Sequence, residues 1–194
     1  MIDKLLASTV LVKASVPDGY HYGSGVVVWS GKGKCVVLTN EHVIRGAGRV
    51  EIHDGSDRFD GVMVERKGWN RSVDIAMLWV DHPAGSWIPV APRGTPVSGD
   101  LLVAGCPGQD RVPYPFATEF LGFESFKSHP SGVGQGISHT GHPKKGQSGG
   151  GILNDRGELV ALISHAACGE NKGLATSLVT DDSWVPDWCR SRGR

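Results

Sequence analysis

The stretch Gly146-Gln147-Ser148-Gly149-Gly150-Gly151-Ile152-Leu153 joins a glycine-rich turn directly to a short apolar strand. Glycine adopts backbone conformations that other residues rarely reach, so such a run favours a tight turn. The segment Asn154–Gly157 follows at once and has the composition of a hairpin turn. A second apolar run then extends from Leu159 to Ser164. Turn, strand, hairpin and strand in this order indicate a chain built of β-strands.

The same alternation extends over the rest of the chain. Runs of Val, Ile, Leu and Thr are separated by Gly, Pro, Asn and Asp, and the 28 glycines and 11 prolines fit a turn-rich fold. About twelve short strands at this spacing predict an all-β sandwich or barrels. We expect strands over Thr9–Ala14, Gly25–Trp29, Cys35–Thr39, Arg49–His53, Gly61–Arg66, Asp74–Val80, Leu101–Gly105, Ala117–Phe123, Gly136–Thr140, Gly151–Leu153, Leu159–Ser164 and Leu174–Leu178.

Helices are expected to be few and short. One is predicted over His42–Arg45 and another over Asp182–Arg190, where Pro186 limits its length. The segment Pro89–Gly99 contains three prolines and two glycines, a composition typical of a linker between two halves of a chain.

The composition excludes several kinds of partner. Acidic and basic residues number 20 each, so the chain has no basic excess of the kind that nucleic-acid binding needs. No apolar stretch approaches the roughly 20 residues of a membrane helix. The N-terminus is interrupted by Asp3, Ser8 and Thr9, which favours a first β-strand over a signal peptide. We therefore expect no nucleic-acid or membrane partner, and a cytoplasmic rather than a secreted protein.

The four cysteines, Cys35, Cys106, Cys168 and Cys189, form no CxxC pair. Without an export signal their thiols are expected to be reduced. One disulfide that uses Cys168 or Cys189 stays open as an alternative.

Three short segments carry residues suited to acyl transfer. His42 lies in Leu38–Ile44, Asp74 in Ser72–Leu78, and Ser148 in the glycine-rich turn. A serine hydroxyl attacks a peptide carbonyl when a histidine takes its proton and a carboxylate orients that histidine. Each residue also has an ordinary structural explanation, as a turn serine, a helix cap or a strand start. Together, in this order, the three predict a catalytic triad.

The glycines of the turn fit a second requirement of this chemistry. An oxyanion hole needs backbone N–H groups that point at one spot, about 3 Å from the reacting oxygen. Gly146 and Ser148 are two residues apart and could both supply such groups. The sequence thus predicts an oxyanion hole made by their N–H groups.

The order and flanks of these residues resemble trypsin-like serine proteases, most closely the HtrA/Deg branch. Thr39–Ile44 matches the branch's T-N-x-H-V-I stretch, Asp74–Leu78 its D-I-A-x-L strand, and Gly146–Gly150 its G-N-S-G-G turn. Gly23–Val26 resembles its G-S-G strand, and Val103–Gly108 its G-x-P-x-G stretch. The resemblance spans roughly residues 8 to 180.

This resemblance implies a chymotrypsin-like fold of two six-stranded antiparallel β-barrels with a short C-terminal helix. Residues 1–92 would form the barrel that carries His42 and Asp74, and residues 93–194 the barrel that carries Ser148 and the specificity pocket. The implied substrate is a protein or peptide, without a cofactor, and the oligomeric state stays open. Gln147 stands where trypsin has an aspartate, so we expect no activation by an ion pair with a new N-terminus.

The resemblance also locates the specificity pocket, near Thr140–Lys145 and Ser164–Ala166. His142 stands six residues before the serine, where trypsin has an aspartate, so a preference for Arg or Lys is not expected. An acid-binding pocket formed by His139, His142 and His165 competes with partly solvated loop histidines. His139 and His142 with Cys168 lack a fourth zinc ligand, so no metal is predicted. The candidate substrate-binding residues are His142, Lys145, Ser164, His165 and Ala166.

The function predicted from these residues is a serine endopeptidase whose rate rises with pH as His42 loses its proton. Two alternatives compete with it: a protease-fold binding module that has lost catalysis, and a processing protease that cuts one partner or itself. Cleavage of casein would argue against the second alternative.

Overall fold

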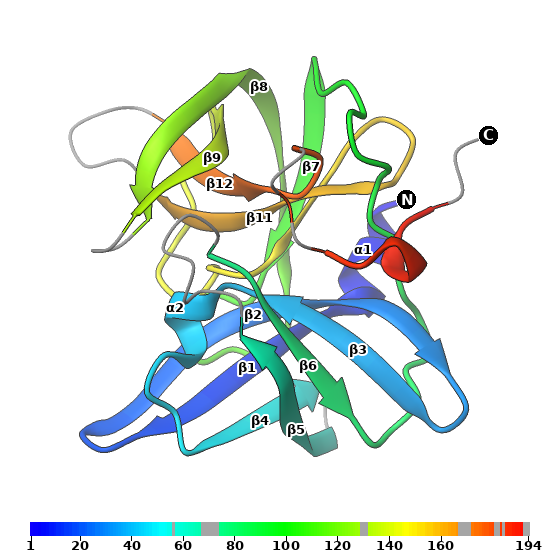
Figure 1. The fold of residues 1–194 in the computed structure, drawn as a ribbon, viewed down its shortest axis with the longest axis vertical. Helices are drawn as coiled ribbons and strands as arrows, with labels where there is room; N and C mark the ends of the chain where they lie inside the picture. The colour runs from blue at the N-terminus through cyan, green and yellow to red at the C-terminus, as the bar shows by residue number, and fades with distance from the viewer. Residues whose placement is uncertain are drawn as a thin grey trace.

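The structure is a computed structural model. It describes residues 1–55, 57–66, 74–128, 132–166, 172–180, 183 and 185–191. Within these residues the strands form two closed six-stranded antiparallel barrels, one above the other in Figure 1. The predicted pair of barrels is thereby confirmed.

The first barrel closes in the strand order β1-β2-β3-β6-β5-β4. Closure requires β1 to pair with both β2 and β4, so that Val12 lies opposite Gly23 on one side and Ile52 on the other. Alternate side chains point inward along each strand and form a core that includes Val12, Val37 and Leu78. The strands are β1 (Thr9–Val16), β2 (Gly19–Gly31), β3 (Lys34–Thr39), β4 (Arg49–Asp54), β5 (Asp57–Arg66) and β6 (Ala76–Val80).

The second barrel closes in the order β10-β11-β12-β9-β8-β7. Its core includes Val103, Ile137 and Ile163, all fully buried. The hairpin of β10 and β11 is the strand–turn–strand unit that follows the glycine-rich turn. The strands are β7 (Asp100–Gly105), β8 (Tyr114–Ser128), β9 (Gly132–His139), β10 (Gly151–Leu153), β11 (Leu159–Ala166) and β12 (Gly173–Ser177).

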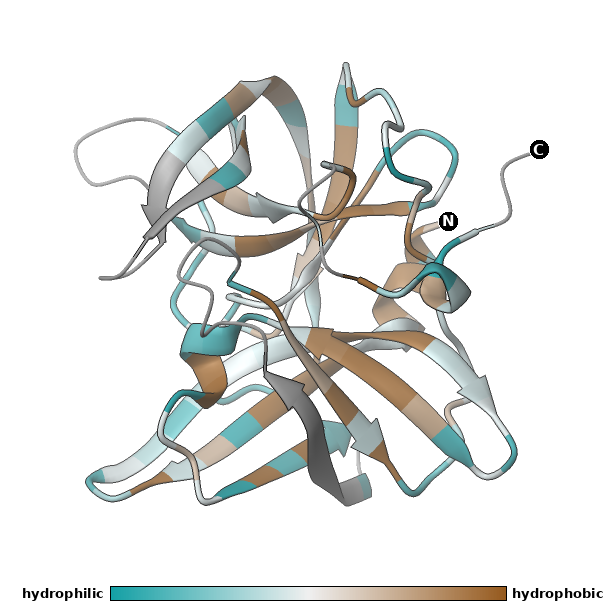
Figure 2. Ribbon diagram, viewed as in Figure 1, coloured by the Kyte–Doolittle hydropathy of each residue, from teal (hydrophilic) through white to brown (hydrophobic). Residues whose placement is uncertain are grey.

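A third apolar cluster joins the two barrels. It contains Leu38 from the first barrel, Leu162 from the second, and Ile88 from the connection between them, each fully buried. Figure 2 shows hydrophobic residues along the strands on both sides of this junction. Because protein interiors are close-packed, such a shared core fixes the orientation of one barrel against the other.

All twelve expected strands are present, with ends that differ. The two largest differences are equal: β2 covers Gly19–Gly31 instead of Gly25–Trp29, and β8 covers Tyr114–Ser128 instead of Ala117–Phe123. Asp74 was expected to open a strand, but it precedes β6, which begins at Ala76. The predicted boundary after residue 92 stays a prediction.

The N-terminal segment differs from the prediction, because it forms a helix, α1 (Ile2–Ser8), before β1 begins at Thr9. Leu5 explains this helix, since its side chain is fully buried in the cluster between the barrels. The hydroxyl of Thr9 donates to the Leu5 carbonyl at 2.8 Å, which satisfies one carbonyl of the helix end.

The other helices are short. The helix expected over His42–Arg45 is α2 (Glu41–Ile44). The helix expected over Asp182–Arg190 is corrected to one 3₁₀ turn, η1 (Asp187–Cys189), which starts only after Pro186. Residues 181, 182 and 184 lie outside the described residues. In the described part of the chain, no helix is long and apolar enough to cross a membrane.

The thiols of Cys35, Cys106 and Cys189 are free and buried. Burial raises the pKa of Cys106 to about 12, and a thiol that stays protonated is a poor nucleophile. Cys168 lies outside the described residues.

Candidate active site

His42 is positioned by the connection between β3 and α2. The strand ends at Thr39, and Asn40 has extended backbone angles before the single helical turn begins at Glu41. The fully buried side chain of Asn40 donates to the carbonyl of Asp74 at 2.8 Å. This bond holds the segment that carries the histidine against the segment that carries the aspartate.

The carboxylate of Asp74 contacts His42 twice. Its Oδ2 lies 2.6 Å from His42 Nδ1, and its Oδ1 accepts a bond from the His42 backbone N–H at 2.8 Å. Asp74 is only 5% exposed, so little water competes for these bonds. A carboxylate beside Nδ1 favours the tautomer with the proton on that nitrogen, which leaves Nε2 as the proton acceptor.

Ser148 lies in a turn whose glycines are required by geometry. Gly146 and Gly149 have φ angles of +94° and +88°, in the region that favours glycine. A Cβ at position 146 would lie 2.4 Å from Gly108 N, and one at position 149 would lie 2.1 Å from Ser24 O. A side chain at either position would therefore force the surrounding backbone apart.

Gln147 anchors this turn from inside the second barrel. The residue is 1% exposed; its Oε1 accepts from the Lys144 N–H at 2.7 Å and its Nε2 donates to Gly105 O at 3.3 Å. An amide supplies both the donor and the acceptor that these two backbone groups need. An aspartate would supply no donor for the Gly105 carbonyl.

The N–H groups of the turn fall into two sets. Those of Gln147, Gly149 and Gly150 bond to backbone carbonyls, whereas those of Gly146 and Ser148 have no backbone acceptor among the described residues. The Lys145 carbonyl accepts a bond from Gly108 N–H at 2.7 Å. Since a trans peptide points its C=O and N–H in opposite directions, the Gly146 N–H points away from Gly108.

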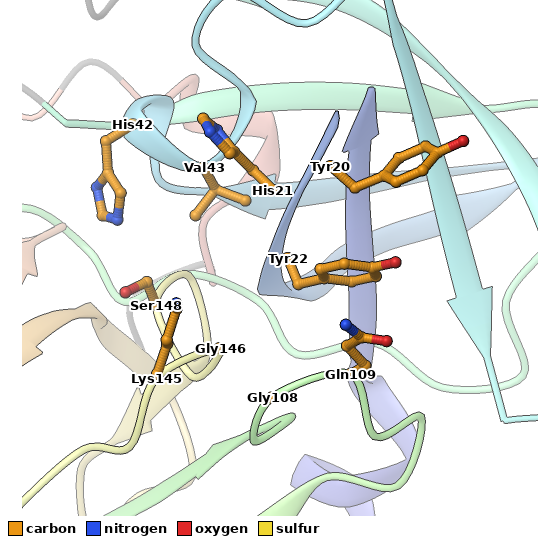
Figure 3. A pocket seen from close by; sticks show the side chains of 10 residues that line it. All are labelled: Tyr20, His21, Tyr22, His42, Val43, Gly108, Gln109, Lys145, Gly146 and Ser148. Carbon is orange, nitrogen blue, oxygen red and sulfur yellow. The ribbon is translucent and has the colours of Figure 1, made fainter. Parts of the chain in front are cut away.

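The hydroxyl of Ser148 donates to the carbonyl of Ser164 at 2.6 Å. Ser148 and His42 line the same cleft, which has a volume of about 600 Å³. Figure 3 shows the His42 ring above Ser148, with Tyr20 and Tyr22 on another wall of the cleft. The remaining lining residues are His21, Val43, Gly108, Gln109, Lys145 and Gly146.

The five candidate substrate-binding residues are placed differently. Lys145 lines the cleft beside Ser148. Ser164 contributes its carbonyl to Ser148, and its hydroxyl lies 2.9 Å from His165 Nδ1. His142 and His165 are exposed. Ala166 ends β11, and its side chain lies outside the described residues.

His139 differs from His142 and His165 because it is fully buried at the end of β9. Its Nδ1 accepts from the Gly141 N–H at 3.1 Å and lies 3.2 Å from the Thr118 hydroxyl. These contacts make it a structural histidine of the second barrel. An acid-binding pocket that uses His139 stays a prediction.

The free energy of unfolding should decrease as the pH falls from about 6.5 to 4. Burial, and to a lesser extent the charge of His142, lowers the pKa of His139 to about 4. The unfolded chain takes up a proton near pH 6.5 that the folded chain excludes, so acid favours unfolding by up to about 3 kcal/mol. Urea unfolding of wild type and His139→Gln across this range measures the effect.

The glutamine variant should show a flatter pH dependence, and the exposed His21→Gln variant should match the wild type. An unchanged slope in His139→Gln would contradict the assignment of the proton to His139.

His139, His142 and Cys168 lack a fourth zinc ligand in the sequence. In the part of the chain that is described, no three His, Cys, Asp or Glu side chains gather in a way that could hold a metal ion. Cys168 is not part of it.

Three contributors to the site were not found from the sequence. They are Asn40, which holds Asp74; Ser24, which contacts the turn of Ser148; and the Tyr20–Tyr22 wall of the cleft. The motif stretches Gly23–Val26 and Thr39–Ile44 contain the first two and were the available signal. The tyrosines lie on no motif, and only the folded hairpin of β1 and β2 brings them to the cleft.

Two closed antiparallel barrels, with a paired histidine and aspartate on one and a serine turn on the other, define the chymotrypsin-like class. Residues 23–162 match the trypsin-like peptidase domain, and the chain belongs to this family.

Curated relatives agree with this assignment. The chain is 31% identical over 181 residues to the putative serine protease HhoA of Synechocystis, covering 83% of this chain and 41% of that protein. It is 32% identical over 145 residues to the periplasmic pH-dependent serine endoprotease DegQ of Escherichia coli, covering 72% of this chain and 30% of that protein. The chain thus spans less than half the length of these relatives.

A solved structure shows the same fold. The active form of the Rv3671c protease of Mycobacterium tuberculosis superposes with a TM-score of 0.77 at 19% identity, covering 98% of this chain and 87% of that one.

Proposed function

We propose that the protein is a serine endopeptidase in which His42, Asp74 and Ser148 form the catalytic triad. The observation that carries this proposal is the double contact of Asp74 with His42, together with Ser148 in the same cleft. Membership of the trypsin-like peptidase family supports it independently. The substrate class is a protein or peptide, as for the proteases that this chain resembles.

The first step moves the Ser148 hydroxyl from the Ser164 carbonyl to His42 Nε2. This exchange of one hydrogen bond for another costs about 1 kcal/mol or less, and catalytic bonds often tighten only when substrate is bound. Ser148 Oγ then attacks the scissile carbonyl while His42 takes its proton. The imidazolium that forms is stabilised by Asp74, which stays ionised.

The Gly146 and Ser148 N–H groups donate hydrogen bonds to the oxyanion of the tetrahedral intermediate and stabilise its negative charge. Their lack of backbone acceptors among the described residues supports this role. His42 next gives its proton to the leaving amine, and the acyl group remains on Ser148. A water molecule activated by His42 then hydrolyses the acyl-enzyme, which restores both residues.

A binding module without catalysis is the second candidate. The bond from the Ser148 hydroxyl to Ser164 O favours it, because in this position the hydroxyl does not donate to His42. The two candidates differ in whether Ser148 can be acylated.

Reaction with a fluorophosphonate probe tests the proposal. The probe phosphonylates only a serine that a working base activates, and mass spectrometry identifies the labelled residue. We expect Ser148 alone to be labelled. Failure to label between pH 6 and 9 would contradict the endopeptidase and favour the binding module.

A further inference from the structure

We propose that Ser24 is a positioning residue that aligns the oxyanion turn of the second barrel from within the first. Ser24 lies in β2 and is fully buried. The turn that it contacts, Gly146–Ser148, is more than 120 residues away in the sequence, since the Ser24–Gly146 pair has a separation of 122. The catalytic part of this inference rests on the proposed function.

Every polar group of Ser24 has a partner at the site. Its hydroxyl donates to Gly146 O at 2.9 Å and accepts from Cys106 N–H at 2.8 Å. Its backbone N–H donates to Ser148 O at 2.7 Å. Its carbonyl accepts from the hydroxyl of Thr39, at the end of β3, at 2.7 Å. One residue therefore links the strand before His42 to the turn that holds Ser148.

The two bonds to the turn fix the peptide planes that lie next to the oxyanion N–H groups. Ser24 holds the carbonyls of Gly146 and Ser148, on either side of Gln147, toward the first barrel. Each of these planes meets, at one Cα, the plane that carries the N–H of the same residue, so holding the carbonyls leaves those N–H groups only the freedom of φ and ψ at that Cα. Those are the N–H groups assigned to the oxyanion hole.

The backbones of strand β2 and of the Ser148 turn approach each other so closely that side chains would not fit between them. A Cβ at Gly149 would lie 2.1 Å from Ser24 O, and one at Gly23 would lie 3.0 Å from Ser148 O. Glycine on each side lets the strand and the turn reach hydrogen-bond distance. The glycines make the approach possible, and the serine hydroxyl adds a bond that no backbone group could supply.

Replacing Ser24 by alanine should lower kcat by about ten- to a hundredfold and leave KM within about twofold of wild type. A misplacement near 1 Å in a catalytic group can cost a hundredfold in rate. The variant loses the donor to Gly146 O and the acceptor of Cys106 N–H, while the backbone bonds of residue 24 remain. Rates are measured on casein at a temperature well below the unfolding of each protein.

Ser30→Ala is a matched control from the same strand. The Ser30 hydroxyl also donates to a backbone carbonyl and accepts from a backbone N–H, those of Ala84 at 3.0 and 2.9 Å. It lies outside the cleft residues. Ser30→Ala should lose stability without losing kcat, which separates positioning from general destabilisation.

Hydrogen exchange followed by mass spectrometry gives a second readout that does not require activity. In Ser24→Ala, amide exchange across Lys144–Gly150 should become faster, and in Ser30→Ala it should match the wild type. Unchanged exchange in this segment, or equal kcat for Ser24→Ala and Ser30→Ala, would overturn the inference. A wild-type chain that fails to react with the fluorophosphonate would count against the proposed function, and the exchange result would still decide the role of Ser24.

Discussion

Replacing Ser148 by alanine should lower kcat on casein by about a millionfold, the size of effect seen when the nucleophile of a serine protease is removed. Neither of two other nucleophilic side chains in the described part of the chain, those of Cys106 and Ser164, can take over. The buried thiol of Cys106 is held protonated by its raised pKa, and Ser164 uses its hydroxyl on His165 Nδ1. The residual rate should be the small enhancement that binding and the oxyanion hole give alone.

The measurement is casein hydrolysis at pH 8 with the Ser30→Ala variant as a control for an ordinary serine deletion. Fluorophosphonate labelling should disappear in parallel. If Ser148→Ala kept more than about one hundredth of the wild-type kcat, where a far larger loss is expected, the nucleophile would lie elsewhere.

Replacing Asp74 by asparagine should lower kcat by about ten-thousandfold near neutral pH. The carboxylate accepts two bonds from His42, one from the ring and one from the backbone. An amide has one acceptor oxygen, and its NH₂ group facing Nδ1 would place the imidazole proton on Nε2. A histidine in that tautomer cannot accept the proton of Ser148.

Asp81→Asn is the matched control for this variant. Asp81 follows β6 in the chain and pairs with Lys34 at 2.8 Å, but both side chains are largely exposed. Exposed ion pairs contribute little to stability, so Asp81→Asn should retain the wild-type kcat. A loss of less than tenfold in Asp74→Asn would show that His42 does not depend on Asp74 for its tautomer.

The sequence predicted the strands well because runs of Val, Ile, Leu and Thr, and the Gly, Pro, Asn and Asp residues between them, are local signals. The triad candidates could also be predicted from the sequence, since each lies in a short motif. Helix α1 was missed because it is stabilised by the burial of Leu5 in the cluster between the barrels. Local helix propensity does not report such a tertiary contact. The length of β8 was missed because strand pairing with β9 extends it beyond its apolar run.

Other features depend on contacts between distant residues. The Gln147 side chain donates to the distant Gly105 carbonyl, and the rotamer of the Ser148 hydroxyl depends on the Ser164 carbonyl. His142 and His139 look alike in the sequence, yet one is exposed and the other is fully buried. This difference in burial arises only when the second barrel closes around His139.

The bond between Ser24 and Gly146 also has a consequence for the time course of folding. Contacts between residues so far apart in the chain form late, because a long loop must close first. During synthesis the first barrel emerges with His42 and Asp74 but without the turn that carries Ser148. The order of the chain therefore keeps His42 and Asp74 apart from Ser148 until both barrels are made and docked.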